Sequence, residues 1–207
     1  VNYGKITFKD GSYTSAQIYL GGLVGYTAFF QIDRCHNYGA ITLEEGSTFA
    51  STLTIGGIAA RNTGEGKTYS INYCTNNAPI LIAADGAADT SIPFQIGGIT
   101  GYSQSLLNYC VNNKEGKITF AGDICTNGKR STLAAPKSGT HSLGGICGYK
   151  TVMTMNNNTN HADIIWSGTV TELSTGDPAQ LRIGGYQGYG SADVNGAVCD
   201  GDIILSG

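Results

Sequence analysis

The stretch IGGITGYSQSLLNYCVNNKEGKITF, residues 96–120, contains three short sequence elements that recur along the whole chain. The first is an aliphatic residue before Gly-Gly, with Gly-Tyr beginning four residues after the first glycine. The second is Asn-Tyr-Cys-x-Asn and the third is Gly-x-Ile-Thr. None of them is long enough to bury an apolar face alone, so their recurrence predicts a fold in which successive copies cover one another.

The double glycine sets the period of this repeat. It follows Leu or Ile in every copy, and its first residue stands at Gly21, Gly56, Gly97, Gly144 and Gly184. The intervals are 35, 41, 47 and 40 residues, so the copies differ by insertions. Five residues after the first glycine stands a tyrosine in four copies and Arg61 in the second copy. An ordered repeat with variable spacers indicates a stacked architecture.

A second block follows each double glycine and contains an asparagine column and an apolar pair. The column consists of Asn37, Asn76, Asn112 and Asn160, with Cys199 in the last copy. Apolar pairs two residues apart, such as Ile118 and Phe120, indicate half-buried strands because side chains alternate between the two faces of a strand. Residues 1–8 match the end of this block, so we expect the sequence to be a fragment of a longer chain.

These features predict an all-β fold, namely a right-handed β-helix-like β-solenoid of about five coils of 35–47 residues that forms one domain over residues 1–207. Each coil is expected to contribute three strands, centred on the double glycine, on Asn-Tyr-Cys and on the Ile-Thr pair. Asparagine side chains should hydrogen-bond along the column, and Asn-Tyr-Gly should form a corner with positive φ. An antiparallel sandwich is the alternative. The insertions, expected to project from one edge, are residues 44–52, 84–93, 122–141 and 167–179.

The Leu-Gly-Gly-x-x-Gly-Tyr element followed by Asn-Tyr-Cys-x-Asn resembles the GLUG-type repeat of large secreted and cell-surface bacterial proteins. The resemblance covers essentially the whole chain, with departures at IAAR, residues 58–61, and MNNNTN, residues 155–160. It implies an extracellular or cell-surface location and an adhesin-like role, sometimes beside an enzyme domain located elsewhere in the parent protein.

Composition narrows the function classes. Charged residues make up 13% of the chain, glycine reaches 31 residues and the formal net charge is −3. Few charges and many Gly, Asn and Thr residues disfavour both disorder and a helical fold. A slightly acidic chain has no basic field for nucleic acid, and its apolar runs are too short for membrane insertion. Neither partner is therefore expected.

The tyrosine column offers the candidate ligand-binding residues. Tyrosines exposed along one strand would suit sugar rings or a host or cell-surface protein, whereas a stacked ladder closing the core is the alternative interpretation. Tyr73 and Tyr109 are expected to reinforce this surface. The candidate residues of the column are Tyr26, Tyr102, Tyr149 and Tyr189.

Cysteine spacing favours free thiols over structural bridges. Cys35, Cys74 and Cys110 share one repeat position, which later copies fill with Asn158 and Ala197, so we expect a stack of small buried side chains. The chain contains no Cys-x-x-Cys pair, which argues against zinc. A disulfide within a second set stays open, consisting of Cys125, Cys147 and Cys199.

Other polar motifs are weak as sites. TGEGKT, residues 63–68, lacks the first glycine of a phosphate-binding loop, and a surface turn is the favoured interpretation. Asp163 and Asp202, with Asp200 close by, could share calcium but more simply occupy an exposed corner. No metal or cofactor is expected from these residues or from the three histidines, His36, His141 and His161.

The sequence therefore predicts an extracellular structural or adhesive module without intrinsic catalysis, serving as a stalk or as a glycan- or protein-binding surface. One alternative is a β-helix polysaccharide lyase or glycoside hydrolase, which would need clustered carboxylates on one face. A second alternative is a filament subunit that associates end to end through unpaired strand edges. Ice binding is a weak third option, because Leu81, Ile165 and Ile204 interrupt the column that carries Thr7, Thr42 and Thr119.

Overall fold

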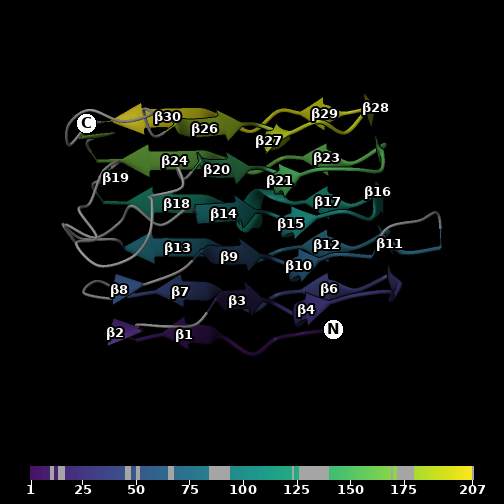
Figure 1. Ribbon diagram of the computed structural model, residues 1–207, viewed down its shortest axis with the longest axis horizontal. Coiled ribbons are helices and arrows are strands. Elements are labelled where there is room, and N and C mark those ends of the chain that lie inside the picture. The colour runs from purple at the N-terminus through teal and green to yellow at the C-terminus, as the bar shows by residue number, and fades with distance from the viewer. Residues whose placement is uncertain are drawn as a thin grey trace, which may run out of the picture.

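The chain forms a β-solenoid of parallel stacked sheets in a computed structural model, which confirms the predicted fold class (Figure 1). Strands account for 57% of the residues and helices for 2%. No helix in the described part of the chain is long and apolar enough to cross a bilayer. The structure describes residues 1–9, 12–13, 17–44, 48–49, 52–64, 68–83, 94–122, 124–125, 140–168, 170–171 and 180–206.

Each coil contains five short strands instead of the predicted three. The double-glycine segment divides into two strands, separated by a bend after the first glycine. The Asn-Tyr-Cys segment also divides, because a residue with left-handed backbone turns the chain in its middle. The strands of the first complete coil are β3 (Ile18–Gly21), β4 (Val24–Thr27), β5 (Ile32–Asp33), β6 (His36–Asn37) and β7 (Ile41–Leu43).

Equivalent strands of successive coils pair to form five parallel sheets. The first sheet contains β3, β9 (Leu53–Gly56), β14 (Phe94–Gly97), β20 (Thr140–Gly144) and β26 (Gln180–Gly184). The second contains β4, β10 (Ala59–Asn62), β15 (Thr100–Ser103), β21 (Cys147–Lys150) and β27 (Gln187–Gly190). The third contains β5, β11 (Ser70–Asn72), β16 (Leu106–Asn108), β22 (Met155–Asn156) and β28 (Val194–Asn195).

The fourth sheet contains β6, β12 (Thr75–Asn76), β17 (Val111–Asn112), β23 (Thr159–Asn160) and β29 (Val198–Cys199). The fifth has six strands, β1 (Ile6–Phe8), β7, β13 (Ile80–Ala83), β18 (Ile118–Ala121), β24 (Ile164–Ser167) and β30 (Ile203–Ser206). A 3₁₀ turn, Lys114–Gly116, precedes β18.

The register places like residues directly over one another. Ile96 pairs with Ile55 on one side and with Leu143 on the other. All of the described strand pairings are parallel, so the antiparallel sandwich is wrong.

Stacking also extends into three of the segments that the sequence pattern predicts as insertions. Within them, β8 (Thr48–Phe49) pairs with β2 (Ser12–Tyr13), and β19 (Ile124–Cys125) pairs with β25 (Val170–Thr171). The expected insertion over residues 122–141 also ends too late, because β20 already contains Thr140 and His141. Backbone pairing between coils therefore extends beyond the five main sheets.

The interior consists of two apolar cores. The first lies between the first and fifth sheets and is built from residues such as Ile55, Ile96 and Phe120. The second lies inside the remaining strands and includes Ile58, Leu107 and Met155. In the coils that carry a column asparagine, the second glycine and this asparagine come, along the chain, between the residues of these two cores. A polar seam therefore runs from Asn2 to Asn160 and ends one coil before the last.

Buried asparagines form this seam, which confirms the predicted stacking. Asn2 donates its amide to Asn37 at 2.8 Å, and the donation continues in the same direction through Asn76, Asn112 and Asn160 at 3.0, 2.9 and 2.9 Å. Nearly every one of these amides also bonds to the backbone two residues ahead, which fixes its orientation. We refer to this column as the inner ladder.

The second glycine of each pair provides room for the inner ladder. A Cβ atom at Gly22 would lie 2.1 Å from the carbonyl oxygen of Gly57 in the next coil and 2.6 Å from the amide carbon of Asn37, and equivalent overlaps arise at Gly57, Gly98 and Gly145. At Gly185, where no further coil follows in the structure and Cys199 replaces the asparagine, a Cβ would be 3.4 Å from the Cys199 Cβ. The glycine motif thus reflects close approach to the backbone of the next coil and to the column asparagine, as well as the expected bend.

A second, outer ladder of asparagines follows the third sheet. Asn108 donates to Asn72 at 2.8 Å, Asn156 donates to Asn108 at 2.8 Å, and Asn195 donates to Asn156 at 3.1 Å. Its amides donate toward the N-terminal coils, whereas those of the inner ladder donate toward the C-terminal coils.

The corner with positive φ lies at a different position from the predicted one. It immediately precedes the cysteine column, whereas Asn-Tyr-Gly at residues 37–39 has no residue with positive φ. Turning the chain there separates the strands of the third sheet from those of the fourth. The corner residues are Arg34, Tyr73, Tyr109, Asn157 and Gly196, with φ between 49° and 63°.

Candidate recognition surfaces

The four candidate tyrosines lie in one column of the second sheet, together with Arg61. Tyr26 pairs with Arg61, Arg61 with Tyr102, and this register continues to Tyr149 and Tyr189. We call this column, with Tyr19 and Arg182 beside it, the tyrosine strip. Its two ends are more accessible than its middle, because Tyr26 is 53% exposed, Tyr102 is 9% exposed and Tyr189 is 36% exposed.

Neighbouring side chains cover the ring faces in the middle of the strip. The Arg61 guanidinium lies 4.5 Å from the ring centre of Tyr102 and 5.7 Å from that of Tyr19. Tyr102 meets Tyr149 edge to face at 5.4 Å, and Tyr149 stacks on Tyr189 at 4.9 Å. Desolvation, followed by the neighbouring tyrosines, raises the pKa of Tyr149. The strip is therefore a packed aromatic and guanidinium layer whose accessible rings stand at its ends.

The copy that departs from the repeat explains part of this packing. Arg61 replaces a tyrosine, and its planar guanidinium lies over the rings of both Tyr19 and Tyr102. The positive charge attracts the ring faces, which a tyrosine at this position would not do. Arg182 takes a related position at the other end, 3.7 Å from the ring centre of Tyr189.

Tyr73 and Tyr109 do not belong to the tyrosine strip, contrary to expectation. They occupy the left-handed corner between the third and fourth sheets, where their rings stack at 5.0 Å with planes 3° apart. Arg34 covers the free face of Tyr73 at 5.5 Å. Both rings are about half exposed, so the column presents ring edges and hydroxyl groups to solvent.

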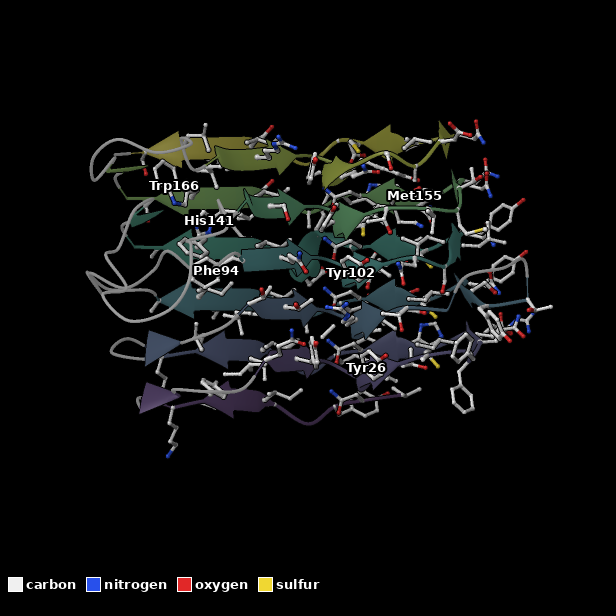
Figure 2. All side chains as sticks on the ribbon, viewed as in Figure 1. Tyr26, Phe94, Tyr102, His141, Met155 and Trp166 are labelled. Atoms are coloured by element: carbon white, nitrogen blue, oxygen red, sulfur yellow. The ribbon has the colours of Figure 1, made fainter. Side chains whose placement is uncertain are left out.

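Two phenylalanines extend this corner into a larger aromatic surface. Phe29 and Phe30, which precede β5, are 65% and 69% exposed, and Phe29 meets Tyr69 edge to face at 5.4 Å. The second copy carries Tyr69 at the position of Phe30, two residues before the paired Ile71 and Ile32, but the three later copies have no aromatic residue there. We call these residues the aromatic corner; they comprise Phe29, Phe30, Arg34, Tyr69, Tyr73 and Tyr109. Figure 2 shows aromatic rings projecting at the end of the solenoid that carries the β5 and β11 turns.

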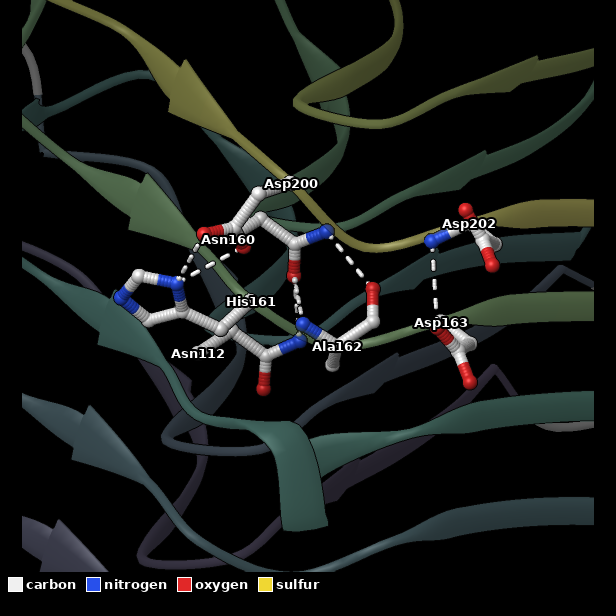
Figure 3. A network of polar contacts seen from close by, with 7 residues as sticks. All are labelled: Asn112, Asn160, His161, Ala162, Asp163, Asp200 and Asp202. Atoms are coloured by element: carbon white, nitrogen blue, oxygen red, sulfur yellow. Dashed lines mark hydrogen bonds and ion pairs between the residues drawn. The ribbon is translucent and has the colours of Figure 1, made fainter.

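The acidic candidates are engaged in contacts between coils (Figure 3). One Asp163 oxygen accepts the backbone N–H of Asp202 at 3.1 Å, and the other lies 3.5 Å from the Lys117 ammonium. Asp200 pairs with the His161 ring at 2.8 Å. In the described residues no three His, Cys, Asp or Glu side chains converge to hold a metal ion. These contacts favour the interpretation of the aspartates as corner residues and not as ligands of a calcium ion.

Two histidines lie within packed positions. His36 is half-buried on β6, and His141 on β20 is 1% exposed beside Phe94, with ring centres 5.3 Å apart. Desolvation lowers the pKa of His141 to about 4. Its Nε2 atom is buried, with no hydrogen-bond partner in the described part of the chain. His141 is therefore a neutral core residue near physiological pH.

The cysteine column consists of free thiols, as predicted, and Cys147 and Cys199 are free as well. Burial raises the pKa of Cys147 to about 12, which makes it unreactive. The side chain of Cys125 and residues 65–67 of TGEGKT lie outside the described residues.

The threonine column lies on the outer face of the fifth sheet. Thr42, Leu81 and Thr119 occur in register there, beside an open groove of about 500 Å³. Ile165 and Ile204 continue the column, so its chemistry is mixed aliphatic and hydroxyl and not a regular threonine array.

No family model, curated protein or solved structure matches the chain.

Proposed function

We propose that this chain is a non-catalytic β-solenoid module of an extracellular or cell-surface protein, and that it recognises a partner protein through the aromatic corner. The observation that supports this most directly is the exposure of large aromatic side chains in one region, two of them phenylalanines more than 60% exposed. Exposed apolar side chains that lie together in one patch are typical of an interaction surface.

The chemistry of the aromatic corner favours a protein partner over a glycan. Sugars pack on open ring faces, whereas Tyr73 and Tyr109 cover each other and Arg34 covers the remaining face of Tyr73. Ring edges, hydroxyl groups and a guanidinium beside exposed phenylalanines suit a protein interface, where Tyr, Phe and Arg are enriched. A glycan is the second candidate, at the tyrosine strip, because Tyr26 at its end is exposed.

The two asparagine ladders support the role of a stiff display module. They connect successive coils through side chains in addition to the backbone pairing of five sheets. A surface carried on such a column keeps its shape before the partner arrives, which reduces the entropy lost on binding.

Replacing both stacked tyrosines tests the proposal. We expect the Tyr73→Ala/Tyr109→Ala variant to bind cultured mammalian cells about 30-fold more weakly, because truncating interface aromatics costs about 2 kcal/mol or more. Binding of the fluorescently labelled chain would be measured by flow cytometry before and after mild protease treatment of the cells. Protease treatment should remove wild-type binding if the partner is a protein.

A matched control is provided by Tyr3 and Tyr38, which stack at 5.1 Å on a different corner and are also exposed. Tyr3→Ala/Tyr38→Ala should keep wild-type binding. Equal loss in both double variants would argue against the aromatic corner. Binding that survives protease and falls in a Tyr26→Ala variant, together with a hit on a glycan array, would favour the glycan candidate.

End-to-end association is a further proposal, supported by exposed Ile203, Ile204 and Leu205 on β30, an outer strand of the fifth sheet. Unpaired strand edges template further strands. Electron microscopy of the purified chain showing only discrete particles would contradict it.

A further inference from the structure

Three thiols stand on adjacent coils beneath the aromatic corner. Asp33 pairs with Asn72 and His36 pairs with Thr75, which places Cys35 opposite Cys74. The same register places Cys110 opposite Cys74 on the other side. Parallel rungs are about 4.8 Å apart. This spacing lies within the Cα separation of roughly 4.4–6.8 Å that a disulfide bond requires.

The three thiols differ in access and in hydrogen bonding. Cys35 is partly exposed, whereas Cys74 and Cys110 are buried. The Cys74 sulfur interacts with the thiols on both sides. Cys110 is anchored from the next coil, because its backbone N–H donates to the Asn158 side chain at 2.8 Å and its thiol donates to the Ile71 carbonyl at 3.3 Å. A dissolved oxidant therefore meets Cys35 first.

We propose that Cys35 and Cys74 are a modification site at which a small-molecule disulfide, such as oxidised glutathione, is exchanged for a covalent link between the first two complete coils. The Cys35 thiolate attacks one sulfur of the oxidant, forms a mixed disulfide and releases one thiolate. The Cys74 thiolate then attacks the Cys35 sulfur, closes the protein disulfide and releases the second thiolate. Two protein thiols are oxidised, one disulfide is reduced, and the two protons pass to the released thiolates.

The surroundings of Cys74 agree with this order. The neighbouring Cys110 side chain is the largest factor that lowers the pKa of Cys74, whereas burial raises the pKa of both Cys35 and Cys110. The second step needs a thiolate at Cys74, because only the thiolate attacks a disulfide. The Cys110 side chain therefore favours the thiolate form of Cys74.

The link would lie one residue from the left-handed corner residues Arg34 and Tyr73. It would fix two neighbouring turns of the aromatic corner relative to each other. Formation of the link does not depend on partner binding, since it involves only the thiols and the oxidant.

The test treats the folded chain with oxidised glutathione, blocks the remaining thiols by alkylation and maps the peptides by mass spectrometry. Chymotrypsin is suitable because Tyr73 and Tyr109 directly precede Cys74 and Cys110, so cleavage separates these cysteines. We expect a Cys35–Cys74 cross-link with alkylated Cys110. Cys199, an exposed thiol in the last coil, reports that the oxidant is active by forming a glutathione adduct.

Two variants test the roles of the individual thiols. In Cys74→Ala, which copies Ala197 at the equivalent position, Cys35 should stop at the glutathione adduct. In Cys110→Ala the Cys35–Cys74 link should still form, but more slowly. A Cys74–Cys110 cross-link in the wild type would overturn the proposal. So would a wild-type Cys35 that stays alkylated or glutathionylated while Cys199 reacts.

Discussion

Replacing Asn112 by alanine is expected to lower the free energy of unfolding by about 4 kcal/mol, because each buried polar group that loses its partner costs about 1–3 kcal/mol. Asn112 is fully buried, accepts the amide of Asn76 and donates to Asn160. Its loss leaves one donor and one acceptor of the inner ladder without their partners and removes the bond to the Gly116 carbonyl. Urea unfolding followed by circular dichroism would measure the change.

Asn113 provides the matched control because it makes the same kind of bond in the neighbouring column. Its amide donates to Asn77 at 2.6 Å, but Asn113 is only half-buried. Water can replace the lost partner there, so Asn113→Ala should cost about 1 kcal/mol or less. Equal losses in the free energy of unfolding for the two substitutions would show that burial does not increase the contribution of an asparagine in the inner ladder.

His141 is expected to make the solenoid less stable in mild acid. Burial favours the neutral imidazole and lowers its pKa from 6.5 to about 4 in the folded chain. Below pH 6.5 the unfolded chain therefore takes up a proton that the folded chain refuses. The contribution of His141 to stability is complete above pH 6.5 and is lost as the pH falls. The loss reaches about 3 kcal/mol at pH 4.

The His141→Leu variant isolates this contribution. Leu181 occupies the same register position in the next coil, so leucine fits the column. The difference in urea unfolding midpoint between the variant and the wild type would be measured at pH 7 and at pH 4.5. Other titrating groups affect both proteins alike, so they cancel in this difference. The variant should gain stability over the wild type at pH 4.5. An unchanged difference between the two pH values would contradict a neutral, buried His141.

The sequence is sufficient to predict what depends on the repeat alone. Ile55, Ile96 and Leu143 occur at one motif position, and the motif order requires them to stack. The asparagine column follows by the same reasoning, because identical amides one rung apart can satisfy one another.

Features that depend on the path of the chain within one coil cannot be predicted in the same way. The sequence pattern places Tyr109 on the wrong surface, because Tyr109 itself has a positive φ and turns the chain at that position. Tyrosine has no preference for positive φ from which this turn could be predicted. At Gly98 the pattern indicates only a bend, because the opposing residue, Asn112, lies on another strand of the coil. The pair Phe29 and Phe30 occurs in one copy, and Tyr69 of the second copy shares only the position of Phe30, so the repeat pattern does not predict the pair.

The opposite directions of the two asparagine ladders have a consequence for the electric field of the solenoid. Each aligned carboxamide carries a dipole, and the dipoles of one ladder add along the axis. The inner ladder points its positive ends toward the last coil, whereas the outer ladder points them toward the first. The two sums oppose each other, so coils can be added without building up partial charge at either tip.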